Sequence, residues 1–290
     1  MGYVLKRLNK KYDIILNEPP QEKYNYLYGI DEIKVAEDLP TKEYNNVITL
    51  DVPALSRIAD VERFLAEEAF IINIDHHSDN TSFGNYNICN IVSSTTEVLY
   101  DIIKELGIEF DKDLAEMIYT GIIYDTGMFR FSLTTEKAYL ISAEMKKAGA
   151  SLDKVAETVY FSKDPETIML LAQTLMSLKT YENGRIGIIV AKISDIKKMC
   201  TKKPDLDDYV NYLMMINGIE VGAFLIEMDE KFYRVSLRSK NDFDVQKVAS
   251  SFSGGGHKKA AGCRLVGNSD EVTFKLITEI KKYLPNASKD

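Results

Sequence analysis

Residues 70–77 read Phe-Ile-Ile-Asn-Ile-Asp-His-His, an apolar run that ends in a carboxylate and two imidazoles. The run Asn46–Leu50 ends in a similar way, at Asp51. Short apolar runs of this kind are typical of strands buried on both faces of a parallel sheet. The carboxyl ends of parallel strands meet at one edge, where open α/β sheets bind ligands. The polar residues that follow the two apolar runs are therefore expected at a ligand-binding edge of the sheet.

Helical patterns alternate with these runs through the first half of the chain, which favours an α/β fold with a parallel sheet. Ser94-Thr95-Thr96-Glu97 has the spacing of a capping box and is expected to open a helix that Gly107 ends. The stretch Leu114–Ile123 is predicted as a helix or a strand that leads to Asp125. Further expected elements are a strand at Tyr12–Leu16, a helix at Thr134–Ala148, and mostly helical structure over 151–182 with a helix start near Pro165.

The pattern changes after residue 184. Glu220–Glu227 and Phe232–Ser239 alternate in polarity around a short turn, which predicts a hairpin. Further expected elements are a strand over Arg185–Ile193, a short helix over Val245–Phe252, a glycine run at Gly254–Gly256 and a closing helix over Val272–Tyr283. We therefore predict a larger parallel-sheet domain over 1–165, a helical linker over 166–184 and a smaller α/β domain over 185–290.

The composition is that of an ordinary globular protein, with 45% apolar and 28% charged residues in a chain of 290. It excludes a largely disordered chain, a collagen-like repeat and a coiled-coil rod. The first residues lack the apolar core of a signal peptide, and no apolar run approaches the roughly 20 residues of a membrane helix. Cys89, Cys200 and Cys263 form no CxxC pair and are expected to be reduced thiols. We expect a cytoplasmic location.

The net charge of −8 is unevenly distributed along the chain. Residues 231–264 carry eight basic and two acidic side chains, a local charge of +6, so the first 230 residues are strongly acidic. An acidic body does not suit a protein that coats long duplexes, because phosphate neutralisation drives such binding. A local basic region suits a small anionic ligand, and an acidic body attracts cations.

Asp51, Asp75 and Asp125 each follow an apolar run, and His76 and His77 come directly after the second of these carboxylates. An unpaired carboxylate at a crowded sheet edge is costly to desolvate, and a bound divalent cation removes this cost. Carboxylates with imidazole suit Mn²⁺, and also Co²⁺, Fe²⁺ or Zn²⁺. The alternative is that these aspartates only cap the helices that follow, which applies best to Asp51.

A second group of polar residues surrounds Gly254–Gly256, which His257, Lys258 and Lys259 follow directly. Successive glycines let backbone N–H groups approach an anion without a Cβ in the way. Arg238, at the end of a predicted strand, is able to bind a phosphate through two hydrogen bonds. The alternative is a flexible glycine loop without a ligand.

Asp75-His76-His77, together with Gly254-Gly255-Gly256-His257, resembles the DHH/DHHA1 phosphoesterases. The similarity is closest to the nanoRNase type, which hydrolyses short oligoribonucleotides and 3′-phosphoadenosine-5′-phosphate. By this resemblance, the first predicted domain is a metal-binding DHH domain and the last a substrate-binding DHHA1 domain. The similarity extends from about Gly2 to about residue 285 and includes Asp51–Arg57, Ser93–Val98, Gly121–Phe131 and Arg238-Ser239.

The resemblance also implies roles for individual residues. Asp51, His76 and Asp125 would be metal ligands, with Asp51 bridging two Mn²⁺ ions. Asp75 would orient His76, and His77 would face the scissile phosphate, which a metal-activated water attacks. The residues implied to hold the terminal nucleotide and phosphate of the substrate are Arg238, Ser239, Gly254, Gly255, Gly256 and His257, with Arg130 as a further candidate whose alternative role is structural.

The chain departs from the family at its start. The first motif of the family, a strand that ends in a histidine and two aspartates, supplies about half of the metal ligands, and this sequence contains nothing similar. Met1–Leu8 is similar to the latter part of the helix that follows that motif, and Asp13 lies at the start of its predicted strand rather than the end. Two interpretations follow: a shortened chain, which we favour, or a half-built site with weak metal binding and little hydrolysis.

The leading functional hypothesis is a metal-dependent phosphoesterase that acts on short single-stranded RNA or DNA, or on a bisphosphorylated nucleotide. The alternatives are a nucleotide-binding protein without a competent metal centre and a phosphodiesterase of linear or cyclic dinucleotides. Neither a long duplex nor a membrane is expected as a partner, and a homodimer is a candidate assembly.

Overall fold

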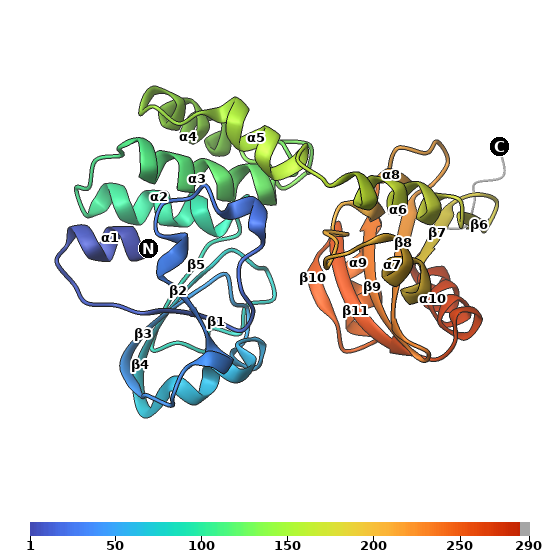
Figure 1. The fold of residues 1–290 in the computed structure, drawn as a ribbon, viewed down its shortest axis with the longest axis horizontal. Coiled ribbons are helices and arrows are strands. Elements are labelled where there is room, and N and C mark those ends of the chain that lie inside the picture. The colour runs from blue at the N-terminus through green and yellow to red at the C-terminus, as the bar shows by residue number, and fades with distance from the viewer. Residues whose placement is uncertain (285–290) are drawn as a thin grey trace. The chain divides into compact units, whose positions relative to one another are not determined.

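The computed structural model describes residues 1–284, in two compact units of which the first is Met1–Ser162 and the second begins at Lys163. Figure 1 shows that each unit combines helices with strands. Both units are α/β structures with parallel strand pairs, so the predicted fold class is confirmed. Within the described residues, no helix has both the length and the apolar character needed to cross a membrane.

The first unit consists of parallel strands, helices and short 3-10 turns. Its strands and α-helices are, in chain order, α1 (Gly2–Arg7), β1 (Ile14–Leu16), β2 (Ile33–Val35), β3 (Tyr44–Leu50), β4 (Leu65–Asp75), β5 (Tyr86–Cys89), α2 (Thr95–Glu105), α3 (Lys112–Asp125), α4 (Glu136–Lys147) and α5 (Leu152–Tyr160). The 3-10 turns between them are η1 (Glu22–Tyr24), η2 (Ile30–Glu32), η3 (Ala36–Asp38), η4 (Leu55–Arg57) and η5 (Ala59–Phe64).

Parallel pairing organises the strands of the first unit. Strands β3, β4 and β5 form one sheet in this order, and β1 pairs with β2 in a separate parallel ladder. Helix α2 packs on β4, and α3 packs against α2, α4 and α5, so that the helices stack on one side of the strands (Figure 1). Ile74, Val98 and Ile122 are among the buried apolar side chains that form this core.

The predicted cap of α2 forms only in part. The Ser94 hydroxyl accepts a hydrogen bond from the Glu97 N–H, as the capping-box spacing predicts. The Glu97 carboxylate does not return to the Ser94 backbone, because it accepts hydrogen bonds from the Ser93 N–H and hydroxyl instead. Gly107 follows the end of the helix in the left-handed region (φ 66°), in agreement with the prediction.

The stretch before Asp125, for which the sequence left helix or strand open, is helix α3. The Asp111 carboxylate caps it by accepting a hydrogen bond from the Leu114 N–H. Gly121 lets α3 approach α2 closely, because a Cβ at this position would lie 1.9 Å from the Thr96 hydroxyl oxygen. Asp125 is therefore at the carboxyl end of a helix and not at the end of a strand.

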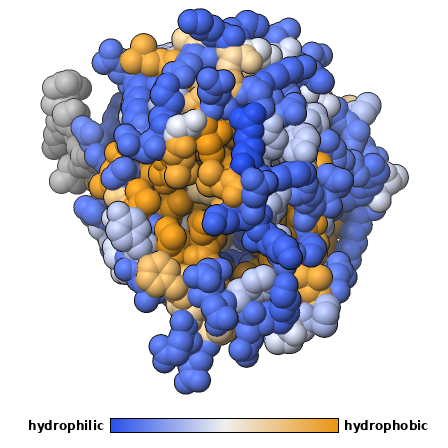
Figure 2. All heavy atoms as spheres, turned by 90° about the vertical axis from the view of Figure 1, so that its left-hand side faces the viewer, coloured by the Kyte–Doolittle hydropathy of each residue, from blue (hydrophilic) through white to orange (hydrophobic). Residues whose placement is uncertain are grey.

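Parts of the strands in the first unit remain exposed. Leu16 of β1, Phe70 of β4 and Tyr86 of β5 are large apolar side chains that water reaches. Figure 2 shows one face on which apolar side chains gather in an area bordered by hydrophilic ones. Parallel sheets are usually covered on both faces, so the described residues leave the strands of this unit only partly covered.

The second unit is built around a mixed sheet. Its elements are α6 (Pro165–Leu175), β6 (Lys179–Tyr181), β7 (Ile186–Ala191), α7 (Ile193–Met199), α8 (Tyr209–Leu213), β8 (Val221–Asp229), β9 (Phe232–Ser239), α9 (Val245–Ser250), β10 (Gly255–His257), β11 (Ala260–Val266) and α10 (Ser269–Tyr283). The strand order is β10-β11-β9-β8-β7-β6, in which β7 and β8 are parallel and the other pairs antiparallel.

Alternating side chains of β8 build a hydrophobic cluster on each face of this sheet. Leu225 lies in the cluster that α9 and α10 cover, and Phe224 in the cluster to which α6, α7 and α8 contribute. This division follows from the two-residue period of a strand. The predicted hairpin is confirmed, because β8 and β9 pair antiparallel.

One predicted segment ends differently in the structure, and for another the structure excludes the alternative. The stretch 151–182 is not helical to its end, because Lys179–Tyr181 is strand β6, which pairs antiparallel with β7. The turn between them is made by Glu182, Asn183 and Gly184, all with positive φ. The glycine run is not a flexible loop, because residues 255–257 pair with β11 as strand β10.

Helix α6 begins at Pro165 and otherwise lies in the stretch 166–184 that was predicted as the linker. Its side chains Leu170 and Leu171 are buried in the hydrophobic cluster of the second unit that also contains Ile189 and Phe224. The boundary between the two compact units precedes this helix, at Ser162. Helix α6 is therefore part of the second unit.

We predict that Leu170→Ala lowers the free energy of unfolding by about 2–5 kcal/mol, because removal of this wholly buried side chain leaves a cavity. Met169→Ala is the matched control, since the neighbouring side chain is 61% exposed and its loss should cost less than about 0.5 kcal/mol. Urea denaturation followed by circular dichroism measures both changes. Equal losses in the two variants would contradict the packing of α6 into this core.

Candidate active site

The register of β3 and β4 places Asp51 beside Asp75. Leu50 is paired with Ile74, and the Asp51 N–H continues the ladder by donating to the Ile74 carbonyl at 3.0 Å. Asp51 has a φ of 61°, a conformation that aspartate tolerates better than most residues and that occurs at turns and functional sites. Its carboxylate accepts a hydrogen bond from the Thr95 hydroxyl at 2.7 Å, which ties it to the first turn of α2.

His76 is buried and directed at two carboxylates. Its Nδ1 lies 3.1 Å from the Val92 carbonyl oxygen, and because a carbonyl only accepts, Nδ1 carries the hydrogen in this contact. In the neutral ring, Nε2 then presents a lone pair, which is the form that binds metals. Nε2 lies 3.5 Å from Asp51 Oδ1 and 3.9 Å from Asp125 Oδ2.

Asp125 joins this group from the end of α3. The ligand atoms of Asp51, His76 and Asp125 all lie within 4.8 Å of one another. Burial, followed by repulsion from the Asp51 carboxylate, raises the pKa of Asp125 to about 8, although the charge of His77 acts in the opposite direction. The charged form of Asp125 is therefore disfavoured unless a cation lies nearby.

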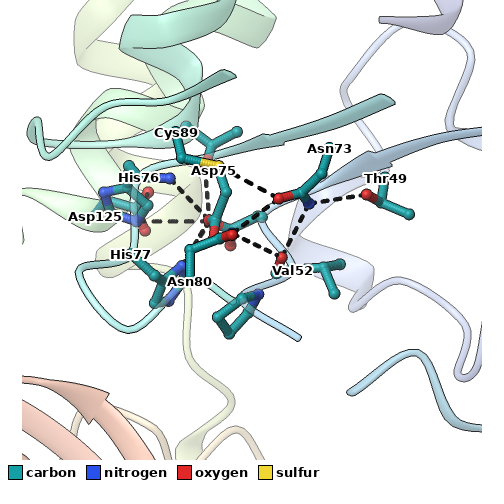
Figure 3. Close-up of polar contacts among 12 residues, drawn as sticks. Thr49, Val52, Asn73, Asp75, His76, His77, Asn80, Cys89 and Asp125 are labelled. Carbon is teal, nitrogen blue, oxygen red and sulfur yellow. Dashed lines mark hydrogen bonds and ion pairs between the residues drawn. The ribbon is translucent and has the colours of Figure 1, made fainter. Parts of the chain in front are cut away.

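Asp75 is wholly buried and holds the His77 ring. Its Oδ1 accepts hydrogen bonds from His77 Nδ1 at 2.7 Å and from the His76 backbone N–H at 2.8 Å, and its Oδ2 accepts one from Asn80 at 2.5 Å (Figure 3). Burial alone would raise the pKa of Asp75, but the bonds from His77 and Asn80 lower it to about 2. The expectation that Asp75 orients His76 is wrong for the ring, which Val92 holds.

The Asp75 contact also affects His77. Burial alone would lower the pKa of His77, but the hydrogen bond to Asp75 and the negative charges of Asp51 and Asp75 raise it above its ordinary value. An imidazole in this setting is a good hydrogen-bond donor to an anion.

Several residues that support this group were not predicted from the sequence. Asn73 and Asn80 form a polar network beneath Asp75, and Thr95 holds Asp51. Asn73 had a signal in the sequence, because it interrupts an otherwise apolar strand. Asn80 had none, because a single asparagine in a loop is common.

The donor set fits a divalent cation. Two carboxylates and one imidazole suit Mn²⁺, Fe²⁺, Co²⁺ or Zn²⁺. An ion that binds its ligands at about 2.1 Å holds neighbouring ligand atoms about 3–3.5 Å apart, close to the observed separations around His76 Nε2. Cys89 lies nearby, but its thiol donates to Asn73 Oδ1. Asp51 also forms a second group of closely spaced ligand atoms with Asp75 and His77.

In the second unit, strand register brings Arg238 and His257 to one face of the sheet. Ala260 of β11 pairs with Arg238 on one side and with His257 on the other. Directly paired residues point to the same face, so the arginine and the histidine flank Ala260 in one row across the strands. The Arg238 guanidinium donates to the Asn211 side-chain oxygen at 3.2 Å and to the Leu237 carbonyl at 3.0 Å.

The glycines allow β10 to lie close to its neighbours. A Cβ on Gly254 would lie 2.2 Å from the Gly262 carbonyl oxygen, and one on Gly256, whose φ is 136°, would lie 2.5 Å from the Ala260 carbonyl oxygen. Strand β10 is the edge of its sheet, so Gly255 and its neighbours pair with β11 along one side only. Edge strands present backbone N–H groups outward.

Ser239 and Arg130 make local contacts in the structure. The Ser239 hydroxyl donates to the Phe243 carbonyl at 2.7 Å, which closes the turn after β9. Arg130 lies in the turn after α3, where its Nε donates to the Gly127 carbonyl at 2.7 Å.

Comparison with known proteins supports the same assignment for both units. Residues 2–122 match the model of the DHH family, N-terminal domain, and residues 185–284 match that of the DHHA1 domain. The bifunctional oligoribonuclease and PAP phosphatase NrnA of Thermus thermophilus is 30% identical over 243 residues, which cover 83% of this chain and 72% of that protein. The NrnA of Bacillus subtilis is 28% identical over 286 residues, covering 97% and 88% of the two chains.

Among solved structures, the crystal structure of an exopolyphosphatase-related protein from Bacteroides fragilis is similar, with a TM-score of 0.88 and 26% identity. The match covers 97% of this chain and 86% of that chain. With both family models matched and NrnA relatives aligned along most of its length, the chain belongs to the DHH/DHHA1 phosphoesterase family.

Proposed function

We propose that the protein is a metal-dependent hydrolase of short oligoribonucleotides, of 3′-phosphoadenosine-5′-phosphate, or of both. The observation that carries this proposal is the convergence of Asp51, His76 and Asp125 within 4.8 Å. The names of the NrnA relatives, which refer to oligoribonuclease and PAP phosphatase activities, support this class of substrate. The proposal includes a cytoplasmic location.

In this proposal, Asp51, His76 and Asp125 would hold Mn²⁺ or a similar divalent ion, and Asp51 would also be a ligand of a second ion. Such an ion would supply a water of lowered pKa and would offset charge on the phosphate. His77, which Asp75 holds through Nδ1, is suited in its protonated form to donate a hydrogen bond from Nε2 to a phosphate oxygen.

The second unit is proposed to bind the terminal nucleotide and its phosphate. Arg238 and His257 share one face of the sheet, and β10 offers backbone N–H groups at its edge. We assign the anion to this region, which lies within the basic stretch 231–264. Gly254, Gly255, Gly256 and Ser239 shape it. Arg130, in the first unit, is proposed separately as a further substrate contact.

The proposal predicts that the purified protein with Mn²⁺ releases mononucleotides from a labelled trinucleotide, and phosphate from the bisphosphorylated nucleotide. A chelator should abolish both reactions, and added Mn²⁺ should restore them. Nucleotide binding without turnover would instead indicate a binding protein, and turnover of dinucleotides alone would indicate a dinucleotide phosphodiesterase.

Substitutions of the two adjacent histidines should have different effects. His76→Ala is expected to raise the dissociation constant for Mn²⁺ roughly tenfold or more, because it removes a metal ligand. His77→Ala should lower kcat by about 10²–10⁴-fold while Mn²⁺ affinity changes less than about twofold. Calorimetric titration with Mn²⁺ and steady-state kinetics separate these effects, and identical profiles for the two variants would refute the assignment.

Arg238→Ala should raise KM roughly tenfold, because a charge-assisted hydrogen bond to phosphate is lost. The effect should be largest for the shortest substrates, which have fewer other contacts. Arg264→Ala is the control, because Arg264 is an exposed arginine on β11 of the same sheet. An unchanged KM in Arg238→Ala would remove this residue from the proposed phosphate site.

A further inference from the structure

We propose that Asn80, supported by Asn73, is a positioning residue that aims the Asp75 carboxylate at the His77 ring. The kinetic part of this inference rests on the proposed function, whereas the geometric part does not. Neither asparagine is among the proposed ligands or substrate contacts, yet both lie in the hydrogen-bond network around Asp75 (Figure 3).

The hydrogen bonds of Asn80 define the orientation of its amide. Its Oδ1 accepts the Ser82 N–H at 2.7 Å, so its Nδ2 must be on the opposite side. From there the two hydrogens of Nδ2 serve Asp75 Oδ2 at 2.5 Å and Asn73 Oδ1 at 2.8 Å, with the Val52 carbonyl at 3.2 Å as a third, shared acceptor. All three acceptors are oxygens, so reversal of the amide would place oxygen against oxygen.

Asn73 is wholly buried and satisfied on both sides of its amide. Its Nδ2 donates to the Thr49 hydroxyl at 2.9 Å and to the Val52 carbonyl at 3.0 Å. Its Oδ1 accepts from Asn80 and from the Cys89 thiol. An apolar residue would fill a buried strand position at lower desolvation cost. The amide instead links three neighbouring strands directly beneath Asp75 and gives Asn80 a fixed acceptor.

In this network the two Asp75 oxygens accept hydrogen bonds from different donors. Oδ2 is occupied by Asn80, and Oδ1 is left for the His76 N–H and for His77 Nδ1. Without the Asn80 bond, the carboxylate is able to rotate about its terminal torsion, which is a broad and soft coordinate. The His77 ring would then lose its fixed partner, although Asn80 does not touch that ring.

The side-chain amides of Asn73 and Asn80 also support the turn that carries Asp51. Both donate to the Val52 carbonyl, and Val52 follows Asp51, the residue with positive φ. The asparagine pair therefore links the turn that presents Asp51 to the carboxylate that holds His77. One internal network positions both the proposed metal ligand and the proposed phosphate contact.

The test uses Asn80→Ala in the full chain, with Asn87→Ala as the matched control. Asn87 lies in the same part of the chain and donates to the backbone carbonyls of Ser82 and Gly84, but not to Asp75. The chain has three histidines, so long-range proton–nitrogen correlation spectra of the metal-free protein resolve their rings. Asn80→Ala should shift the His77 ring nitrogens, and Asn87→Ala should leave them unchanged.

In kinetic assays, Asn80→Ala should lower kcat roughly tenfold, because one hydrogen bond to a charged group is lost. KM and Mn²⁺ affinity should stay within about twofold of the original, because Asn73 still donates to the Val52 carbonyl beside Asp51. Thermal denaturation checks that the variant folds. If it does not, Asn80→Ser, whose shorter side chain also loses the amide contacts, takes its place with the same expected shift in the His77 signals.

The inference would be overturned if the His77 ring-nitrogen signals were unchanged in the folded variant, or if Asn87→Ala shifted them equally. If the protein with its natural residues hydrolyses none of the substrates, the proposed function fails. The ring spectra still decide the positioning role of Asn80 in that case, because they require neither metal nor turnover.

Discussion

The parallel pairing of β3 with β4 is the interaction on which the proposed metal centre depends. With Leu50 opposite Ile74, the next residues on the two strands are Asp51 and Asp75, and both carboxylates reach the same edge. A slip of one residue would turn one set of side chains to the other face. The hydrogen bond from the buried Asn73 amide to the Thr49 hydroxyl supports this register from within the sheet.

Electrostatics gives neighbouring carboxylates different roles. Asp75 receives hydrogen bonds from His77 and Asn80, which stabilise its charge and lower its pKa. Burial and the nearby Asp51 charge raise the pKa of Asp125 instead. A carboxylate that is already satisfied by donors is suited to hold an imidazole, whereas two carboxylates that repel each other are suited to share a cation.

Strand register also positions the proposed substrate-binding residues of the second unit. Strand β11 lies between β9 and β10, so that Arg238 and His257 flank Ala260 although nineteen positions separate them in the chain. The glycines serve this arrangement, because side chains at Gly254 and Gly256 would collide with carbonyl oxygens of β11. A run that is often a flexible loop is here part of a sheet.

The α/β class, the strands that lead to Asp51 and Asp75, the hairpin of the second unit and the family could all be predicted from the sequence, because they depend on local periodicity and on short motifs. Tertiary structure decided that Asp125 joins the group from a helix end, that Asp75 holds the ring of His77 rather than that of His76, and that Asn73 and Asn80 connect the two sides of the site. These contacts depend on strand register and on the direction in which each side chain leaves its element, and a linear pattern of residue types does not specify either.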